Sequence, residues 1–215
     1  MLPDLREHWQ TVYKEKAPDQ VSWFQPELHV SHSLITSVAP SLDARIVDVG
    51  GGTSTLADTL LAAGYTNIAV LDLAPAALDR SRVRLGAGAA AVEWLTGDVL
   101  TYPFPAQSID VWHDRAVFHF LTNAEDRELY IAQVKRALRP GGHLLVATFA
   151  EDGPTRCSGF PVRRYSPGQL HGAFGPGFTL EKNVREDHTT PSGGHQPFTY
   201  CLCQWEPEKS LHTAA

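Results

Sequence analysis

The sequence has few cysteines and no pattern that would tie them together. Cys157, Cys201 and Cys203 are an odd number without CxxC spacing, which indicates neither a disulfide framework nor a zinc site. We therefore expect no metal and interpret the three residues as buried free thiols. A soft-metal or metalloid site at Cys201 and Cys203, which would share one face of a strand, is the alternative.

Long apolar runs and an excess of basic residues are also missing. No stretch approaches the roughly 20 apolar residues that cross a bilayer, and the opening MLPDLREHWQ lacks the basic-then-apolar order of a signal peptide. We expect a cytoplasmic protein without a membrane partner. The formal net charge of -6 argues against nucleic acid as a partner, because such binding requires phosphate neutralisation. The sequence carries no signal for an oligomeric state.

What the sequence does contain is an alternation of Val- and Ile-rich runs with segments of helical period. This is the pattern of βα units around a parallel sheet, and 215 residues are enough for one domain with a sizeable core. Within a single domain over 1–215, we predict a helical cap or lid over 1–41 and a ligand-binding core over 42–150. Residues 151–215 then form an acceptor-side segment and terminal antiparallel strands.

Three consecutive glycines, Gly50, Gly51 and Gly52, follow a predicted strand over residues 45–49. Ligands of open α/β sheets bind beyond the carboxyl ends of the strands. Glycines at that place let the chain turn sharply and let a ligand approach the backbone N–H groups that open the next helix. We expect a ligand to lie across these glycines; a merely tight turn is the alternative.

Acidic residues end the strands that follow. Asp72 ends the second predicted strand, where a carboxylate accepts hydrogen bonds from ribose hydroxyls, and Asp98 ends the third, placed to accept from an amino group such as that of adenine. With Asp48 before the glycines, they suit a nucleoside ligand without a phosphate. Thr55 stands where a GxGxxG fingerprint would have its third glycine, which disfavours a nicotinamide-dependent oxidoreductase. Helix caps or solvated turn residues are the alternative for each acid.

This set of features resembles the class I S-adenosylmethionine-dependent methyltransferases. The segments that carry the resemblance are VDVGGG, LDL, GDV, IDVWHDR and LRPGG, which lie between about residues 45 and 149. The resemblance implies an α/β, Rossmann-like fold with a seven-stranded, mostly parallel sheet, an antiparallel terminal strand and helices on both faces. It also implies S-adenosyl-L-methionine as the cofactor.

The resemblance further implies a set of cofactor-binding residues. Gly50 and Gly52 would pass under the methionine part, Asp72 would hold the ribose and Asp98 the adenine. The complete expected set is Asp48, Gly50, Gly51, Gly52, Thr53, Asp72, Leu73, Gly97, Asp98, Val99, Asp114 and Arg115.

Methyl transfer from a sulfonium is an in-line displacement with a good leaving group. Alignment and desolvation therefore dominate, and a general base is needed only when the acceptor must lose a proton. The candidate catalytic residues lie at or just after the fourth predicted strand. They are His113 and His119 as possible bases, and Asp114 as a contact to the methionine amino group or the acceptor. For both histidines a structural role is the alternative.

The acceptor side is expected to come from two other segments. The residues are Trp9, Tyr13, Trp23 and Phe24 in the N-terminal part, and Arg163, Arg164 and Tyr165 in the part after the core. An aromatic cap packed on the sheet is the alternative for the first group, and a solvated edge is the alternative for the paired arginines.

We predict an enzyme that methylates a small-molecule acceptor. The segments WQTVYKEKAPDQVSWFQ and HDR are also similar to a methyltransferase-like group that includes protein-lysine methyltransferases, so a protein side chain is the alternative acceptor. That group usually has Asp-Lys followed by Gly, where this chain has Asp114, Arg115 and Ala116. A binding module that keeps the cofactor site but not the chemistry is a further alternative.

Overall fold

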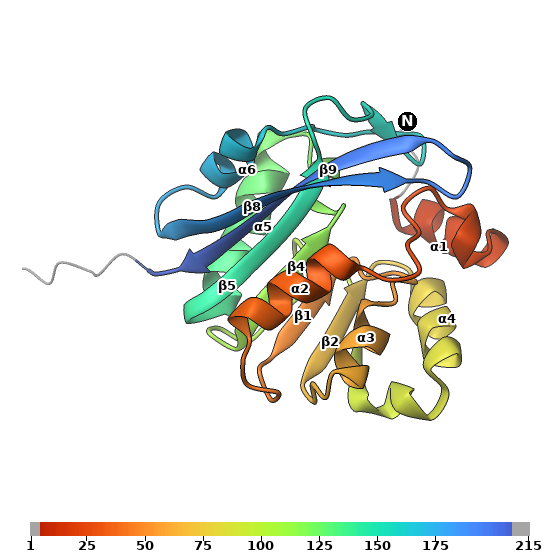
Figure 1. Cartoon of the computed structure of the whole chain (residues 1–215), viewed down its shortest axis with the longest axis horizontal. Coiled ribbons are helices and arrows are strands. Elements are labelled where there is room, and N and C mark those ends of the chain that lie inside the picture. Colours follow the sequence, from red (N-terminus) through yellow and green to blue (C-terminus); the bar gives the residue numbers. More distant parts are fainter. Residues whose placement is uncertain (1–4, 208–215) are drawn as a thin grey trace, which may run out of the picture.

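The computed structural model describes residues 5–207, and it is built around one seven-stranded sheet (Figure 1). The strand order is β3-β2-β1-β4-β5-β9-β8. Strand β9 runs antiparallel to both of its neighbours, and the other strands share one direction. The strands are β1 Ile46–Val49, β2 Ile68–Asp72, β3 Val92–Thr96, β4 Ile109–Arg115, β5 Leu138–Phe149, β8 Phe178–Thr189 and β9 His195–Trp205. A two-stranded hairpin, β6 Arg156–Cys157 with β7 Phe160–Pro161, stands apart from this sheet.

Helices cover both faces of the sheet, which confirms the predicted fold class. The helices are α1 Leu5–Glu15, α2 His29–Val38, α3 Leu56–Ala62, α4 Pro75–Leu85, α5 Ala124–Ala137 and α6 Pro167–Phe174. Short 3-10 helices are η1 Pro18–Gln20, η2 Gly86–Ala91 and η3 Phe118–Phe120. Over residues 5–207, no helix has the length and apolar character to cross a membrane.

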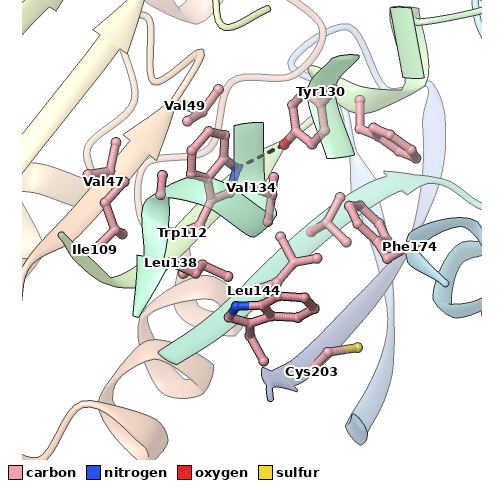
Figure 2. Packing of buried hydrophobic residues seen from close by; sticks show 14 of the residues in the cluster. Val47, Val49, Ile109, Trp112, Tyr130, Val134, Leu138, Leu144, Phe174 and Cys203 are labelled. Carbon is pink, nitrogen blue, oxygen red and sulfur yellow. Dashed lines mark hydrogen bonds between the residues drawn. The ribbon is translucent and has the colours of Figure 1, made fainter. Parts of the chain in front are cut away.

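Alternation along the central strands divides the core into two layers. Ile46 of β1 packs with Ile35 of α2 and Leu60 of α3 on one face of the sheet, while Val47 belongs to the layer that α5 and α6 cover on the other face. Figure 2 shows this second layer, where Trp112 of β4 donates its indole N–H to the hydroxyl of Tyr130 at 2.9 Å. Successive residues of a buried strand therefore face different helices.

Helix α1 lies at the edge of the molecule beside α4 and the β6–β7 hairpin (Figure 1). The side chain of Gln10 accepts a hydrogen bond from Ala76 N at the start of α4, at 3.1 Å. On the other side, His8 Nε2 is 3.0 Å from Ser158 Oγ in the hairpin. These contacts bring the N-terminal helix over the carboxyl ends of the central strands.

Candidate active site

A cavity of about 440 Å³ opens at the carboxyl ends of β1, β2, β3 and β4. The strand order reverses between β1 and β4, and such a switch point is where open α/β sheets bind ligands. One side, which we call the nucleoside wall, consists of Gly50, Asp72, Leu73, Gly97, Asp98 and Val99. A second group of lining residues, which we call the aromatic wall, consists of Leu5, Trp9, Tyr13, Trp23 and Phe120.

The glycine turn after β1 is packed against protein atoms on several sides. A Cβ atom on Gly51 would lie 2.6 Å from Asp48 Oδ2, and one on Gly52 would lie 2.4 Å from the hydroxyl of Tyr13. Gly52 also has a φ of +55°, which disfavours any side chain. A Cβ atom on Gly50 would overlap Val117 Cγ2, and Gly50 also has a φ of +64°. Tight packing within the protein therefore disfavours a side chain at all three glycines, and Gly50 in addition lines the cavity.

Two acidic residues of the nucleoside wall line the cavity, Asp72 at the end of β2 and Asp98 two residues after the end of β3. Asp72 is buried and accepts a hydrogen bond from Ala74 N at 2.8 Å. Burial raises the pKa of Asp72 to about 7, although hydrogen bonds from the backbone of Ala74 and Gly52 oppose the shift. Asp98 is half-buried and accepts from Leu100 N at 2.9 Å. Each carboxylate keeps further lone pairs that can accept hydrogen bonds from a ligand.

Asp114 lies outside the cavity lining, in the layer covered by α5. Its carboxylate accepts hydrogen bonds from Val117 N at 2.8 Å, Phe118 N at 3.0 Å and the Tyr130 hydroxyl at 2.5 Å. Burial raises the pKa of Asp114 to about 6, and the Tyr130 hydrogen bond is the largest opposing effect. This residue fixes the turn after β4, so the geometry does not support its expected contact with the methionine amino group or the acceptor.

Both candidate histidines also lie outside this cavity. His113 is hydrogen-bonded through Nδ1 to Asp48 and through Nε2 to Ser31. His119 is buried between the rings of Phe120 and Phe149. Burial, with a smaller effect of the Arg115 charge, lowers the pKa of His119 to about 3. The geometry supports the structural alternative for both residues.

The alternation of side chains along β4 explains why His113 and Asp114 point away from the large cavity. His113 faces α2, where it meets Ser31, and the next residue, Asp114, faces α5, where it meets Tyr130. A side chain inside a sandwiched strand points to one helical layer or the other. The last residue of the strand, Arg115, and the residues that follow it, Ala116 and Val117, are the ones that reach the cavity.

The expected acceptor residues separate into two groups. Trp9, Tyr13 and Trp23 line the cavity together, with the Trp9 and Trp23 rings edge-to-face at 5.5 Å between centroids. Phe24 lines a smaller cavity of about 40 Å³ on the other side of Tyr13. The second group lies away from both cavities.

That second group is Arg163, Arg164 and Tyr165. Tyr165 is buried and stacks on Phe118, and Arg163 places its guanidinium 5.3 Å from the Tyr165 ring centre. Arg164 donates to the backbone carbonyl of Gly153 at 3.0 Å. The structure thus does not bring these three residues to the acceptor side of the large cavity.

Arg115 contributes to the cavity lining, but its guanidinium is used to join three segments. It donates to the Tyr200 hydroxyl at 3.0 Å, to the Trp23 carbonyl at 3.2 Å and to Glu186 at 3.3 Å, and it lies 4.1 Å from the ring centre of Phe198. The side chain expected to bind cofactor therefore holds the aromatic wall to β8 and β9.

Sequence reasoning missed several residues of the lining: Leu5, Phe120, Leu121, Ala116, Val117 and Cys157. Leu5 was available from helical spacing, because it lies four residues before Trp9 and eight before Tyr13 on one helix face. Ala116 has a φ of +78°, a left-handed conformation that an alanine rarely adopts. The thiol of Cys157 is buried, and burial raises its pKa to about 12.

Comparisons with known proteins agree with this architecture. Residues 47–146 match the family model described as methyltransferase domain. The ubiquinone/menaquinone biosynthesis C-methyltransferase UbiE of Roseobacter denitrificans is 33% identical over 117 residues, which are 53% of this chain and 46% of that protein. The chain thus spans about half the length of this relative. EEF1A lysine methyltransferase 4 of Mus musculus is 26% identical over 186 residues, 80% of this chain and 71% of that protein.

The fold also matches solved structures. The 1,6-didemethyltoxoflavin-N1-methyltransferase of Burkholderia thailandensis, solved with 1,6-didemethyltoxoflavin and S-adenosylhomocysteine, superimposes with a TM-score of 0.71 at 17% identity. The match covers 94% of this chain and 87% of that one. The domain match, the relatives and the strand order together confirm the resemblance read from the sequence, which is to the class I S-adenosylmethionine-dependent methyltransferases.

Proposed function

We propose that this chain is an active enzyme that transfers a methyl group from S-adenosylmethionine to a small-molecule acceptor. The observation that carries the proposal is that Gly50, Asp72 and Asp98 line the same cavity as Trp9 and Trp23. Polar acceptor groups for a nucleoside and an apolar surface for a second molecule are thus in one space.

The nucleoside wall fits the cofactor by the chemistry of its donors and acceptors. Asp72 would accept hydrogen bonds from the ribose hydroxyls, and Asp98 with Val99 would hold the adenine. Gly50 would lie beside the methionine part, since its backbone is open to the cavity. The bound cofactor would supply the methyl group that is attached to its sulfonium sulfur. The rest of the cofactor leaves as a neutral thioether, which needs no acid.

The aromatic wall would hold the acceptor and exclude water. Trp9 contacts both Trp23 and Phe120 edge-to-face, each at 5.5 Å between ring centroids. Large aromatic surfaces bind apolar or flat molecules well, and alignment in a dry site is the main requirement for this displacement. We place the acceptor between these rings and the turn after β4.

The first test is calorimetric titration of the purified chain with S-adenosylhomocysteine, with NAD in a parallel titration. We expect binding of the first and not of the second. Small thiols and amines are then screened with S-adenosylmethionine labelled in its methyl group. Binding without transfer to any acceptor class would favour the non-catalytic module, and binding of NAD alone would overturn the proposal.

A protein side chain remains the second candidate acceptor. The observation in its favour is that the similarity to the mouse lysine methyltransferase extends over 80% of this chain, against 53% for the ubiquinone/menaquinone enzyme. Labelled cofactor with a lysine-containing peptide array distinguishes the two. Label on peptides but on none of the small molecules would replace our proposal with this one.

A further inference from the structure

Three polar side chains beneath the glycine turn form one hydrogen-bonded chain. Asp48 Oδ1 is 2.7 Å from His113 Nδ1, and His113 Nε2 is 2.9 Å from Ser31 Oγ. The exposed fractions of Asp48, His113 and Ser31 are 3%, 1% and 0%. The parallel register places Asp48 of β1 directly beside His113 of β4, and α2 supplies Ser31 from above that face.

The hydrogen-bonding order Ser–His–Asp is that of a hydrolytic triad, but the three residues are too deeply buried here to act as one. Ser31 is completely buried within α2, and it lies outside the lining of both cavities at this end of the sheet. A nucleophile must reach its substrate, and a triad is recognised by its roles as well as by its geometry. The chain of hydrogen bonds therefore does not make a nucleophile of Ser31.

The other end of the chain of hydrogen bonds meets the glycine turn. A Cβ atom on Gly51 would lie 2.6 Å from Asp48 Oδ2, the carboxylate oxygen that does not face His113. The Asp48 carboxylate thus lies directly against the backbone of the middle glycine. Its position decides how much room the turn has on that side.

The flanking glycines have other supports. Gly50 N donates to Leu71 O at 2.7 Å, and Gly52 O accepts from Ser81 Oγ at 2.9 Å. Gly51 N donates to the same Leu71 carbonyl at 3.3 Å, and Gly51 O accepts from Ser54 N at 2.8 Å. Of the three glycines, the middle one is the residue whose Cβ position meets the Asp48 carboxylate.

We infer that His113 and Ser31 are positioning residues for cofactor binding, because they hold the Asp48 carboxylate in place beneath Gly51. The inference rests on the proposed function, since the glycine turn belongs to the proposed cofactor site. Without His113 the buried carboxylate loses its hydrogen-bond partner, and because an unpaired buried polar group is costly, the carboxylate must move. That movement would shift the turn that belongs to the proposed cofactor site.

The test compares His113→Phe with His113→Asn. Phenylalanine fills the space but removes both hydrogen bonds, whereas the asparagine amide can still donate to Asp48 from near the position of Nδ1. We expect the dissociation constant of S-adenosylhomocysteine to rise about tenfold in His113→Phe and about threefold in Ser31→Ala, which leaves the bond to Asp48 in place, and to stay within about twofold of the parent in His113→Asn.

Ile35→Val controls for a general loss of stability, because Ile35 is a buried apolar residue of the same helix as Ser31. We expect it to lower the melting temperature without changing the dissociation constant. If Ile35→Val and His113→Phe lowered the melting temperature equally and also lost affinity equally, the positioning role would be contradicted. Unchanged affinity in a folded His113→Phe would contradict it too.

A second measurement uses the parent protein and does not depend on a variant that folds. The His113 Nδ1–H proton is observed by NMR during titration with S-adenosylhomocysteine, and we expect its resonance to move as the site fills. A resonance that stays fixed while calorimetry shows binding would overturn the inference and leave the proposed function intact. Absence of binding by the parent would remove both.

Discussion

The two walls of the cavity differ in how the chain places their residues. The nucleoside wall comes from the ends of adjacent parallel strands, so the register of β1, β2 and β3 alone brings its parts together. The aromatic wall combines α1 and Trp23 with Phe120, which lies almost a hundred positions further along the chain. Backbone pairing assembles the first wall, and side-chain packing assembles the second. We therefore expect substitutions in the two walls to change ligand affinity and stability differently.

The largest effect is expected from Gly52→Val. The side chain would meet the Tyr13 hydroxyl, 2.4 Å from the Cβ position, at a φ of +55°, and a strained backbone of this kind costs about 1–3 kcal/mol. We expect no detectable binding of S-adenosylhomocysteine by calorimetry. Gly88→Val is the control, because its Cβ position has no neighbour closer than 3.7 Å. Normal binding by a folded Gly52→Val would show that the turn lies outside the cofactor site.

Asp72→Ala is expected to have the next largest effect. It removes the proposed acceptor of two ribose hydrogen bonds, so the dissociation constant should rise about a hundredfold. Circular dichroism must show that the variant keeps the parent fold. Parent-like affinity for S-adenosylhomocysteine would mean that the ribose assignment is wrong and that Asp72 only caps the start of α4.

The raised pKa of Asp72, about 7, gives a pH dependence to the nucleoside wall. Ribose hydroxyls favour the ionised carboxylate, so affinity is complete above pH 7 and falls as the pH drops below it. Each pH unit below 7 should raise the dissociation constant about tenfold. Calorimetry in buffers of different ionisation enthalpy should show proton release at pH 6. Asp72→Asn should bind weakly at every pH, and the same slope in this variant would assign the titration to another group.

Ala116→Gly tests the strain at the junction between the two walls. Glycine adopts a φ of +78° without cost, so the free energy of unfolding should rise by about 1 kcal/mol. Chemical denaturation measures the change. Ala132→Gly, on an exposed position of α5, is the matched control and should lower the free energy of unfolding by a similar amount. A loss in both variants would show that Ala116 is unstrained.

The smallest effect is expected from the double substitution Arg163→Ala with Arg164→Ala. Both residues are exposed and lie away from the cavity, so affinity for S-adenosylhomocysteine should change less than about twofold. The rate with the first acceptor found by the labelled screen should also stay near the parent value. A large loss of that rate would restore the sequence-based assignment of these arginines to the acceptor.

Much of the fold and of the nucleoside wall could be predicted, because the place of a residue relative to the end of its strand is enough to say where in the sheet it lies. A residue at the carboxyl end of a parallel strand lies at the shared edge of the sheet whatever its neighbours are. This holds for Gly50, Asp72 and Asp98. The roles of His113 and Asp114 could not be fixed in this way, because the partner that each face offers, Ser31 or Tyr130, lies on a distant helix.

By itself, the sequence determined the βα pattern around a parallel sheet and the acids at the strand ends, since hydrophobic periodicity and strand ends are local properties. The class I fold and the cofactor followed from the resemblance that the motifs along those strands carry. Only the tertiary structure decided that Tyr13 covers Gly52, that Arg115 ties the aromatic wall to β8 and β9, and that Arg163 and Arg164 lie elsewhere. These outcomes depend on which side chains meet across long separations in sequence, and packing of the whole domain selects those pairs.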